Sequence, residues 1–219
     1  MTLSSDMAKD RLCDARLYLL LTRAGCHLEP AIVLDEALAA GVDVVQVREP
    51  ESEDRDLLEW VHDVRERCAR HRVPVIVNDR PDVALLAGAD GVHLGQNDLP
   101  PRAVRELVGE DLIVGLSTHD PEQIRAALEE PVDYIGVGPL FDTATKGLDG
   151  IGIGWLEDGL DIAPIPSFGI GGVAPENIRD VVETGVTGVA VSSAICAARE
   201  PGAMVHALRM AFDDASDDA

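Results

Sequence analysis

Two Asn-Asp pairs lie close together in the chain, Asn78-Asp79 and Asn97-Asp98, and each follows a short apolar run. The runs are VPVIV before the first pair and GVHLGQ before the second. Carboxylate oxygens are the ligands that Mg²⁺ prefers, and a substrate phosphate can complete its coordination. The spacing therefore predicts that Asp79 and Asp98 bind one Mg²⁺ together. The alternative is that each aspartate caps the helix that follows it, because aspartate is a favoured N-cap residue.

A second pattern, nearer the C-terminus, indicates phosphate binding. The motif GIGG, with Gly171 and Gly172, and the motif SSAI, with Ser192 and Ser193, each end a predicted strand. Glycine lets an anion approach the backbone closely, and barrels commonly bind phosphate between the loops after their last two strands. Either motif alone is weak, since glycine also ends strands for packing reasons. Their joint position predicts a phosphate site.

Both patterns need strand ends that meet in space, and the chain supplies alternating strands and helices. The expected strands are nearly continuous in Val, Ile and Leu, which is typical of a parallel sheet buried on both faces. They cover residues 16–23, 43–49, 73–79, 90–96, 112–118, 134–141, 165–172 and 188–195. The helix-length segments between and after them cover 30–41, about 53–70, 81–88, 101–109, 121–130, 154–160, 175–185 and 202–214.

Eight such units predict an α/β fold, a single-domain (β/α)8 TIM barrel. Residues 1–219 are expected to form one domain, with about 1–15 as an N-terminal extension and about 213–219 as an acidic tail. The alternative is an open doubly wound sheet, but TRAGCHLEP follows the first strand instead of a glycine-rich GxGxxG turn. Barrel enzymes carry their active site at the carboxyl ends of the strands, so Asp79, Asp98 and both phosphate motifs are expected there.

Composition narrows the classes of partner and compartment. The chain has 40 acidic and 18 basic residues, a formal net charge of −22, so repulsion disfavours nucleic acids and anionic membranes. No apolar run approaches the roughly 20 residues that span a bilayer, and the start lacks the pattern of a secretory signal. Four scattered cysteines without a CxxC pair indicate free thiols in a cytoplasmic protein. Small molecules are the expected partners, and monomer and homo-oligomer both stay open.

Lysine is scarce, because Lys9 and Lys146 are the only lysines among the 18 basic residues. An acidic, lysine-poor surface is expected of a protein from a high-salt cytoplasm, where salt screens its self-repulsion. The alternative is an acidic protein from an ordinary cytoplasm, since the terminal DDASDDA adds four carboxylates by itself.

Seven stretches resemble the thiamine phosphate synthase family. The match covers the chain from about Tyr18 to Ile195, with the stretches in the family's order. ADGVHLGQND and the run from YIGVGP to TATK are the most specific. The stretches are QVRE, VNDR, ADGVHLGQND, GLSTH, DYIGVGPLFDTATK, GIGGVAPENI and GVAVSSAI. The resemblance implies a single barrel that joins an aminopyrimidine diphosphate to a thiazole phosphate and releases pyrophosphate, with Mg²⁺ as the metal.

The resemblance also implies roles for individual residues. Asp79 and Asp98 correspond to the family's magnesium ligands. The groups around the pyrimidine diphosphate correspond to Gln46, Arg48, Asn78, Ser117 and Lys146, of which Arg48, Ser117 and Lys146 are the implied catalytic residues. The thiazole-phosphate site corresponds to Thr143, Thr145, Gly171, Gly172, Ser192 and Ser193. In the implied mechanism the diphosphate leaves first, and the thiazole nitrogen attacks the pyrimidine-methyl cation, so positive charge near the leaving group is required. The alternative to the implied role of Lys146 is that it is a solvated loop residue without a function in catalysis.

One departure from the family leaves two alternatives open. The family usually has lysine after QxRE, and this chain has Pro50, which carries no charge and no N–H. A related barrel, the thiazole tautomerase, isomerises the thiazole phosphate alone, resembles KGLDGIG of this chain, and would use His119 to shuttle protons. The metal carboxylates favour the synthase over this alternative. The third interpretation is a non-catalytic sensor of thiamine precursors on the same barrel.

Overall fold

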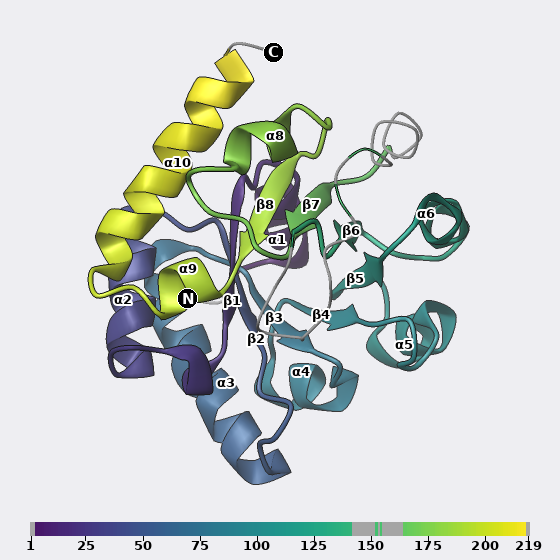
Figure 1. Cartoon of the computed structure of the whole chain (residues 1–219). Coiled ribbons are helices and arrows are strands. Elements are labelled where there is room, and N and C mark those ends of the chain that lie inside the picture. The colour runs from purple at the N-terminus through teal and green to yellow at the C-terminus, as the bar shows by residue number, and fades with distance from the viewer. Residues whose placement is uncertain (1–2, 142–151, 153, 155–163, 218–219) are drawn as a thin grey trace.

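Eight parallel strands close into a barrel in the computed structural model, which describes residues 3–141, 152, 154 and 164–217 (Figure 1). Each strand pairs with its neighbour in chain order, and the last pairs with the first. The strands are β1 Leu17–Leu21, β2 Val44–Val47, β3 Val75–Asn78, β4 Gly91–Leu94, β5 Ile113–Thr118, β6 Tyr134–Val137, β7 Ser167–Ile170 and β8 Gly188–Val191. The predicted (β/α)8 barrel is confirmed, and the open doubly wound sheet is wrong.

Helices surround the barrel, and their ends follow the local sequence. Proline occupies the first turn of α2, α4, α5 and α6, and Gly41 and Gly88 end α2 and α4 in the left-handed conformation. The helices are α1 Ser5–Cys13, α2 Pro30–Ala40, α3 Asp54–His71, α4 Pro81–Ala87, α5 Pro101–Val108, α6 Pro121–Leu128, α8 Ile178–Val182, α9 Ser193–Cys196 and α10 Pro201–Asp217. A 3₁₀ turn, η1, spans Arg23–Gly25. The predicted helix over 154–160 falls, apart from Gly154, outside the described residues.

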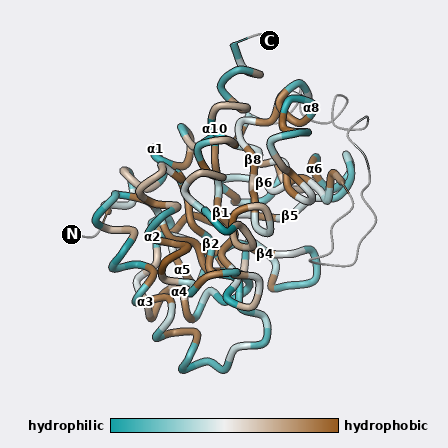
Figure 2. The backbone as a smooth tube through the Cα atoms, turned by 60° about the vertical axis from the view of Figure 1, so that its left-hand side comes forward, coloured by the Kyte–Doolittle hydropathy of each residue, from teal (hydrophilic) through white to brown (hydrophobic). Residues whose placement is uncertain are grey.

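The buried side chains form two separate cores, as a barrel requires. One core lies between the strands and the surrounding helices and is mostly Val, Leu and Ala. The other fills the barrel interior and includes Tyr18, Ile76, Tyr134 and Phe168. Figure 2 shows the resulting pattern, with hydrophobic strands inside and hydrophilic stretches along the outer segments. Within the described residues, every helix is too short or too polar to span a lipid bilayer.

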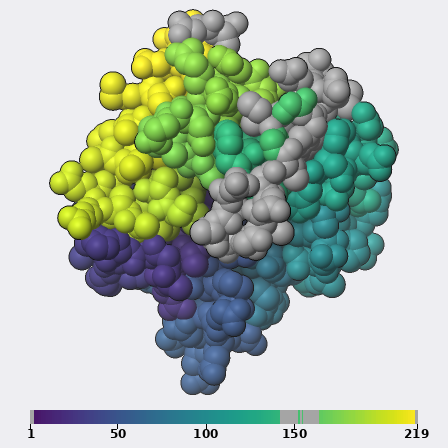
Figure 3. All heavy atoms as spheres, in the orientation of Figure 1, coloured from purple at the N-terminus to yellow at the C-terminus, as the bar shows by residue number. Residues whose placement is uncertain are grey.

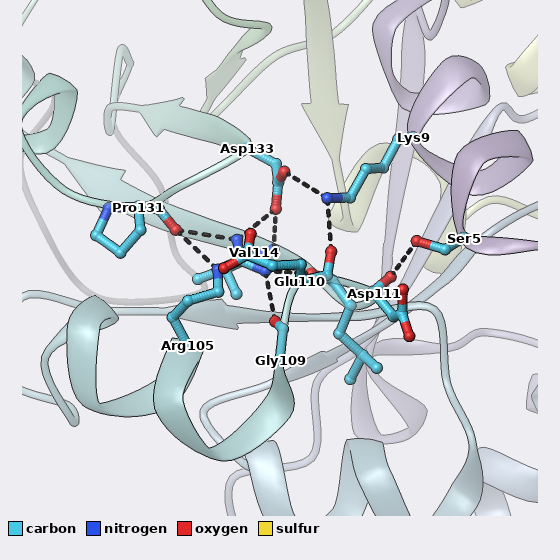
Figure 4. Close-up of polar contacts among 10 residues, drawn as sticks. Ser5, Lys9, Arg105, Gly109, Glu110, Asp111, Val114, Pro131 and Asp133 are labelled. Carbon is cyan, nitrogen blue, oxygen red and sulfur yellow. Dashed lines mark hydrogen bonds and ion pairs between the residues drawn. The ribbon is translucent and has the colours of Figure 1, made fainter.

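Helix α1, in the segment expected as an extension, closes the amino-terminal end of the barrel. Ala8 and Leu12 are buried against the interior core. Lys9 holds the helix in place, because its Nζ donates to the Glu110 carbonyl at 2.8 Å and pairs with Asp133 at 3.2 Å (Figure 4). One of the two lysines therefore fastens this closure.

Asp133 links α1 to α5 through a second cation. Its Oδ2 accepts from Arg105 Nη2 and from the Val114 N–H, both at 2.8 Å. Arg105 is 8% exposed and also donates to the carbonyls of Gly109 and Pro131, as Figure 4 shows, and to that of Leu112. A buried guanidinium is stable only when its donors are satisfied, and these contacts supply the acceptors.

Two predicted boundaries are wrong at the C-terminal end of the chain. The strand predicted over 188–195 ends at Val191, and Ser193 begins the short helix α9. The helix predicted over 175–185 is shorter, because α8 spans only Ile178–Val182. Helix α10 packs along α2 and α8, and it continues through the acidic residues as far as Asp217 (Figure 1).

Candidate active site

The carboxyl ends of the strands surround an open cavity. Residues near the ends of β1, β2, β5, β6, β7 and β8 line it. The predicted site residues in its wall are Arg48, Ser117, Gly171, Gly172, Ser192 and Ser193, and His119 lies beside them. The strand ends of a barrel thus bring together groups that are far apart in the sequence, as the fold predicts.

A deeper pocket continues from this cavity into the barrel. Both are lined by Leu20, Arg48, Ser117, Gly136, Ile170 and Ala190. The deeper part adds residues from earlier positions of the same strands and from β3 and β4, namely Tyr18, Gln46, Asn78, His93, Tyr134 and Phe168. Since parallel strands all run toward the mouth, earlier positions lie further from it. Arg48 and Ser117 therefore stand at the junction of the two compartments.

A chain of side-chain hydrogen bonds crosses the deep pocket. Gln46 Nε2 donates to the Tyr18 hydroxyl at 2.9 Å, and this hydroxyl is 2.8 Å from that of Tyr134. The Tyr134 hydroxyl is 2.9 Å from His93 Nδ1, and His93 Nε2 is 2.8 Å from Ser117 Oγ. These residues come from β2, β1, β6, β4 and β5. The position of the Ser117 hydroxyl on β5 is thus set by groups on four other strands.

Burial fixes the charge state of this chain and leaves one acceptor open. Desolvation raises the pKa of both Tyr18 and Tyr134, so both hydroxyls stay neutral at physiological pH. Gln46 is 2% exposed, and its Oε1 has no hydrogen-bond partner among the described residues. A buried acceptor without a partner costs about 1–3 kcal/mol. A ligand in the deep pocket is expected to donate a hydrogen bond to it.

Arg48 brings a positive charge to the junction. In the described part of the chain its guanidinium pairs with no carboxylate, whereas the side chains of Arg23 and Arg80 do. The adjacent Glu49 is engaged elsewhere, since its Oε1 accepts from the Arg23 N–H at 2.7 Å. The charge of Arg48 is therefore available to an anionic ligand in either compartment.

The GIGG turn forms one wall of the outer cavity. Gly171 and Gly172 have φ of 96° and 68°, a conformation that favours glycine, and a Cβ on Gly171 would lie 2.7 Å from Pro139 Cα. Asn177 holds the turn, because its Nδ2 donates to the Gly172 carbonyl at 2.9 Å. Its Oδ1 accepts from the Ala174 N–H at 2.9 Å. The turn is thus shaped by backbone that only glycine adopts easily.

The other wall begins where β8 ends. Ser192 precedes α9 and Ser193 is its first residue, and both line the cavity. The first N–H groups of a helix have no acceptor within the helix, which makes them donors for an anion. Facing the GIGG turn, this wall completes a cradle suited to a phosphate.

His119 lies at the same mouth with one ring nitrogen committed. Its Nδ1 contacts the Gly138 carbonyl oxygen, which only accepts, so Nδ1 carries the proton. Its backbone N–H donates to Gln123 Oε1 at 2.9 Å. In the neutral ring, Nε2 is therefore an acceptor.

Asp79 and Asp98 lie at the mouth ends of the neighbouring strands β3 and β4. Asp79 has φ of 61° and its N–H donates to the His93 carbonyl at 2.8 Å, which fastens it beside β4. Asp98 Oδ2 accepts from the Gly95 N–H at 2.6 Å. Neither is a helix cap, because the N-cap residues of α4 and α5 are Arg80 and Pro100.

Two exposed carboxylates on adjacent strand ends fit a hard cation such as Mg²⁺, provided that a ligand supplies further oxygens. Within the described residues, no group of three or more His, Cys, Asp or Glu side chains could hold a metal by itself. A metal here would thus need oxygens from a substrate.

The described members of the predicted site fall into two groups. Those lining the cavity or the deep pocket are Gln46, Arg48, Asn78, Ser117, Gly171, Gly172, Ser192 and Ser193. Asp79 and Asp98 stand at the mouth, and Thr143, Thr145 and Lys146 lie outside the described residues. Four further residues of the deep pocket were not predicted from the sequence, namely Tyr18, His93, Tyr134 and Phe168. Polar or aromatic residues within otherwise aliphatic strands were the signal that could have found them.

Comparison with known proteins settles the family. Residues 17–195 match the family model described as thiamine monophosphate synthase. The chain belongs to this family. The resemblance predicted from the seven motifs is thereby confirmed. The solved structure of the thiamine phosphate pyrophosphorylase from Pyrococcus furiosus superposes on this chain with a TM-score of 0.85. The two are 31% identical, and the match covers 93% of this chain and 98% of that one.

Curated relatives in the thiamine monophosphate synthase family differ in length. The thiamine-phosphate synthase of Pelotomaculum thermopropionicum is 45% identical over 179 residues, 81% of this chain and 82% of that protein. The thiamine-phosphate synthase of Thermosynechococcus vestitus is 40% identical over 199 residues, 90% of this chain. The chain spans 56% of the length of that relative and of one from Gloeobacter violaceus.

Proposed function

We propose that this protein is a thiamine phosphate synthase, a transferase of thiamine biosynthesis. It couples 4-amino-2-methyl-5-hydroxymethylpyrimidine diphosphate to thiazole phosphate and releases pyrophosphate. The observation that carries the proposal is the continuity of two compartments through Arg48 and Ser117. One compartment is a polar slot in the barrel interior, and the other has glycine and serine walls suited to a phosphate. Two substrates, one of them a phosphate ester, fit such a pair.

The deep pocket orients the pyrimidine in this proposal. The open Oε1 of Gln46 accepts from the exocyclic amine of the ring, and Asn78 lines the slot beside it. The hydrogen-bond chain through His93 holds the Ser117 hydroxyl at the junction, where the carbon that changes partners would lie. Holding two reactants in line in this way removes much of the entropic cost of their encounter.

Charge at the mouth promotes departure of the diphosphate. Arg48 supplies one cation, Lys146 would supply a second, and Asp79 and Asp98 would hold Mg²⁺, which contributes positive charge to the leaving group when bound. Thiazole phosphate would bind Gly171, Gly172, Ser192 and Ser193, together with Thr143 and Thr145. Its ring nitrogen would then face the pyrimidine across Ser117.

An assay with both substrates tests the proposal. We expect thiamine phosphate and pyrophosphate to form in equal amounts when both substrates and Mg²⁺ are present, and neither to form when one substrate is omitted. Isomerisation of thiazole phosphate alone, lost in His119→Ala, would identify the tautomerase. The orientation of His119 makes this arm informative, because its Nε2 is free to accept a proton. Binding of both substrates without turnover would identify the sensor.

Pro50 stands where the family usually has lysine, and it is exposed just beyond β2. Restoring the cation with Pro50→Lys is expected to raise kcat/KM for the pyrimidine diphosphate up to about tenfold, equivalent to roughly 1.4 kcal/mol. The KM for thiazole phosphate should not change, and the gain should shrink as salt screens the charge. Pro50→Gln is the matched neutral control. A Lys variant no better than the Gln variant at any salt concentration would show that position 50 does not face the diphosphate.

The acidic composition gives a prediction about salt. We propose that the protein works in a salt-rich cytoplasm, on the basis of its net charge of −22 and of its four free thiols. Because the Debye length falls to about 3 Å at molar salt, KCl should relieve self-repulsion and raise the melting temperature. Thermal melting from low to molar KCl measures this, with sucrose as the non-ionic control. A melting temperature indifferent to KCl would contradict the salt-rich setting.

A further inference from the structure

Two thiols, Cys26 and Cys196, meet where the barrel closes on itself. Cys26 follows η1 at the end of β1, and Cys196 ends α9, which follows β8. The residues on both sides of Cys26 reach Cys196. The His27 N–H donates to the Cys196 carbonyl at 2.8 Å, and a Cβ on Gly25 would lie 4.0 Å from Cys196 Cβ. Figure 3 shows the N-terminal, purple part of the chain lying against the yellow-green part near α9.

Both sulfur atoms are directed at the same strand end. Cys26 Sγ lies 3.4 Å from the Thr22 carbonyl oxygen, and Cys196 Sγ lies 3.6 Å from that of Leu20. A hydrogen bond between the thiols is the main cause of opposite shifts, which raise the pKa of Cys26 and lower the pKa of Cys196 to about 7. The lowered pKa makes the Cys196 thiolate available near neutral pH, and the thiolate is the reactive form.

The other two cysteines lack this arrangement. Burial and the carboxylates of Asp10 and Asp14 raise the pKa of Cys13, which is exposed. Burial raises the pKa of Cys68, which is fully enclosed. Neither is favoured as a thiolate. The pair at the seam is therefore chemically distinct within the chain.

We propose that Cys26 and Cys196 are a disulfide-forming site, oxidised by a low-molecular-weight disulfide such as oxidised glutathione. Cys26 is the partly exposed member and takes the oxidant: its proton passes to the Cys196 thiolate, its sulfur attacks one sulfur of the oxidant, the S–S bond of the oxidant breaks, and one small thiolate leaves and takes that proton from Cys196. The Cys196 thiolate then attacks the Cys26 sulfur of the mixed disulfide and expels the second small thiol. The protein loses two hydrogen atoms, and the oxidant is reduced to two thiols.

The bond would join the end of β1 to the helix after β8. These segments are far apart in sequence, so the crosslink closes nearly the whole barrel into one covalent loop and restricts the unfolded chain strongly. It would also act beside the cavity, because Thr22 and Ser192 line the cavity and the Cys196 N–H donates to the Ser192 carbonyl at 2.9 Å. The proposal depends on the thiols alone and stands whatever reaction the barrel catalyses.

Oxidised glutathione at neutral pH, followed by peptide mass mapping, tests the site. We expect one crosslinked peptide pair containing Cys26 and Cys196, lighter by two hydrogens, loss of two of the four free thiols, a higher melting temperature and full reversal by dithiothreitol. Cys26→Ser and, separately, Cys196→Ser should abolish the crosslink, whereas Cys13→Ser should leave it intact. Glutathione adducts without the crosslink in the unmodified sequence would overturn the proposal, as would a crosslink that survives in Cys26→Ser.

Discussion

Replacing Asp98 with alanine is expected to lower turnover by at least about 100-fold, the scale on which loss of direct electrostatic support at a reacting centre is felt. The reason is that Asp98 and Asp79 are proposed to hold Mg²⁺ with the departing diphosphate. Pyrophosphate release as a function of Mg²⁺ concentration measures the effect. The melting temperature should change little, because Asp98 is exposed.

Alanine also removes the hydrogen bond that Asp98 Oδ2 accepts from the Gly95 N–H, so a second variant is needed. Asp98→Asn keeps an acceptor for that N–H but removes the charge, and it should be nearly as inactive as Asp98→Ala. Glu106→Ala, on the adjacent helix α5, is the control for loss of an exposed carboxylate. An active Asp98→Asn would mean that Asp98 serves the turn and binds no metal.

Replacing Gly115 with alanine is expected to destabilise the fold by about 1–3 kcal/mol, the usual cost of an overpacked core. A Cβ at this position of β5 would lie 2.1 Å from Tyr134 Cζ and 2.5 Å from its hydroxyl. The Tyr134 ring cannot move away easily, because its hydroxyl is hydrogen-bonded to that of Tyr18 and Phe168 packs edge-on against it, with 5.7 Å between the two ring centroids. The melting temperature should fall by about 2–4 °C per kcal/mol in a chain of this size.

Two further variants separate the clash from other effects of alanine. Gly154→Ala is the matched control, since a Cβ there would meet no atom of the described residues within 4 Å. Tyr134→Leu should rescue much of the stability of Gly115→Ala by removing the ring, while the activity stays low because His93 loses the hydroxyl at its Nδ1. If Gly115→Ala melted like Gly154→Ala, the barrel interior would be looser than the packing of Tyr134 implies.

Strand existence and order could be predicted from the chain, and the interior contacts could not. The Val and Ile runs marked eight buried strands, and the glycine and proline residues marked many helix ends. The same runs carried Tyr18 and Tyr134, whose importance depends on partners 116 positions apart in sequence. No local pattern reveals such a pair. Gly115 likewise resembles an ordinary strand glycine in the sequence, and only its pairing with Tyr134 on the adjacent strand β6 shows that a side chain there has no room.

The candidate site also has features that could be predicted from the sequence and features that could not. Arg48, Ser117, Gly172 and Ser192 could be assigned to the barrel mouth because strand ends are legible from sequence, and all of them line the cavity. The SSAI motif lies at the mouth as predicted, but its predicted strand conformation is wrong. Apolar and small residues after Val191 suit a strand, yet they form α9. Short helices are decided by the loops around them, which periodicity does not describe.

Within the part of the chain that the structure describes, helix α1 closes one end of the barrel and leaves the end at the carboxyl termini of the strands open. Ala8 and Leu12 of this helix are buried in the interior core together with Tyr18. In the described structure the deep pocket therefore opens to solvent through the outer cavity. This arrangement imposes an order of binding and release. Whatever occupies the slot beside Gln46 must arrive before the outer compartment fills and must leave after it empties. In the proposed reaction the pyrimidine diphosphate therefore binds first. Thiazole phosphate that binds before it blocks access to the deep pocket.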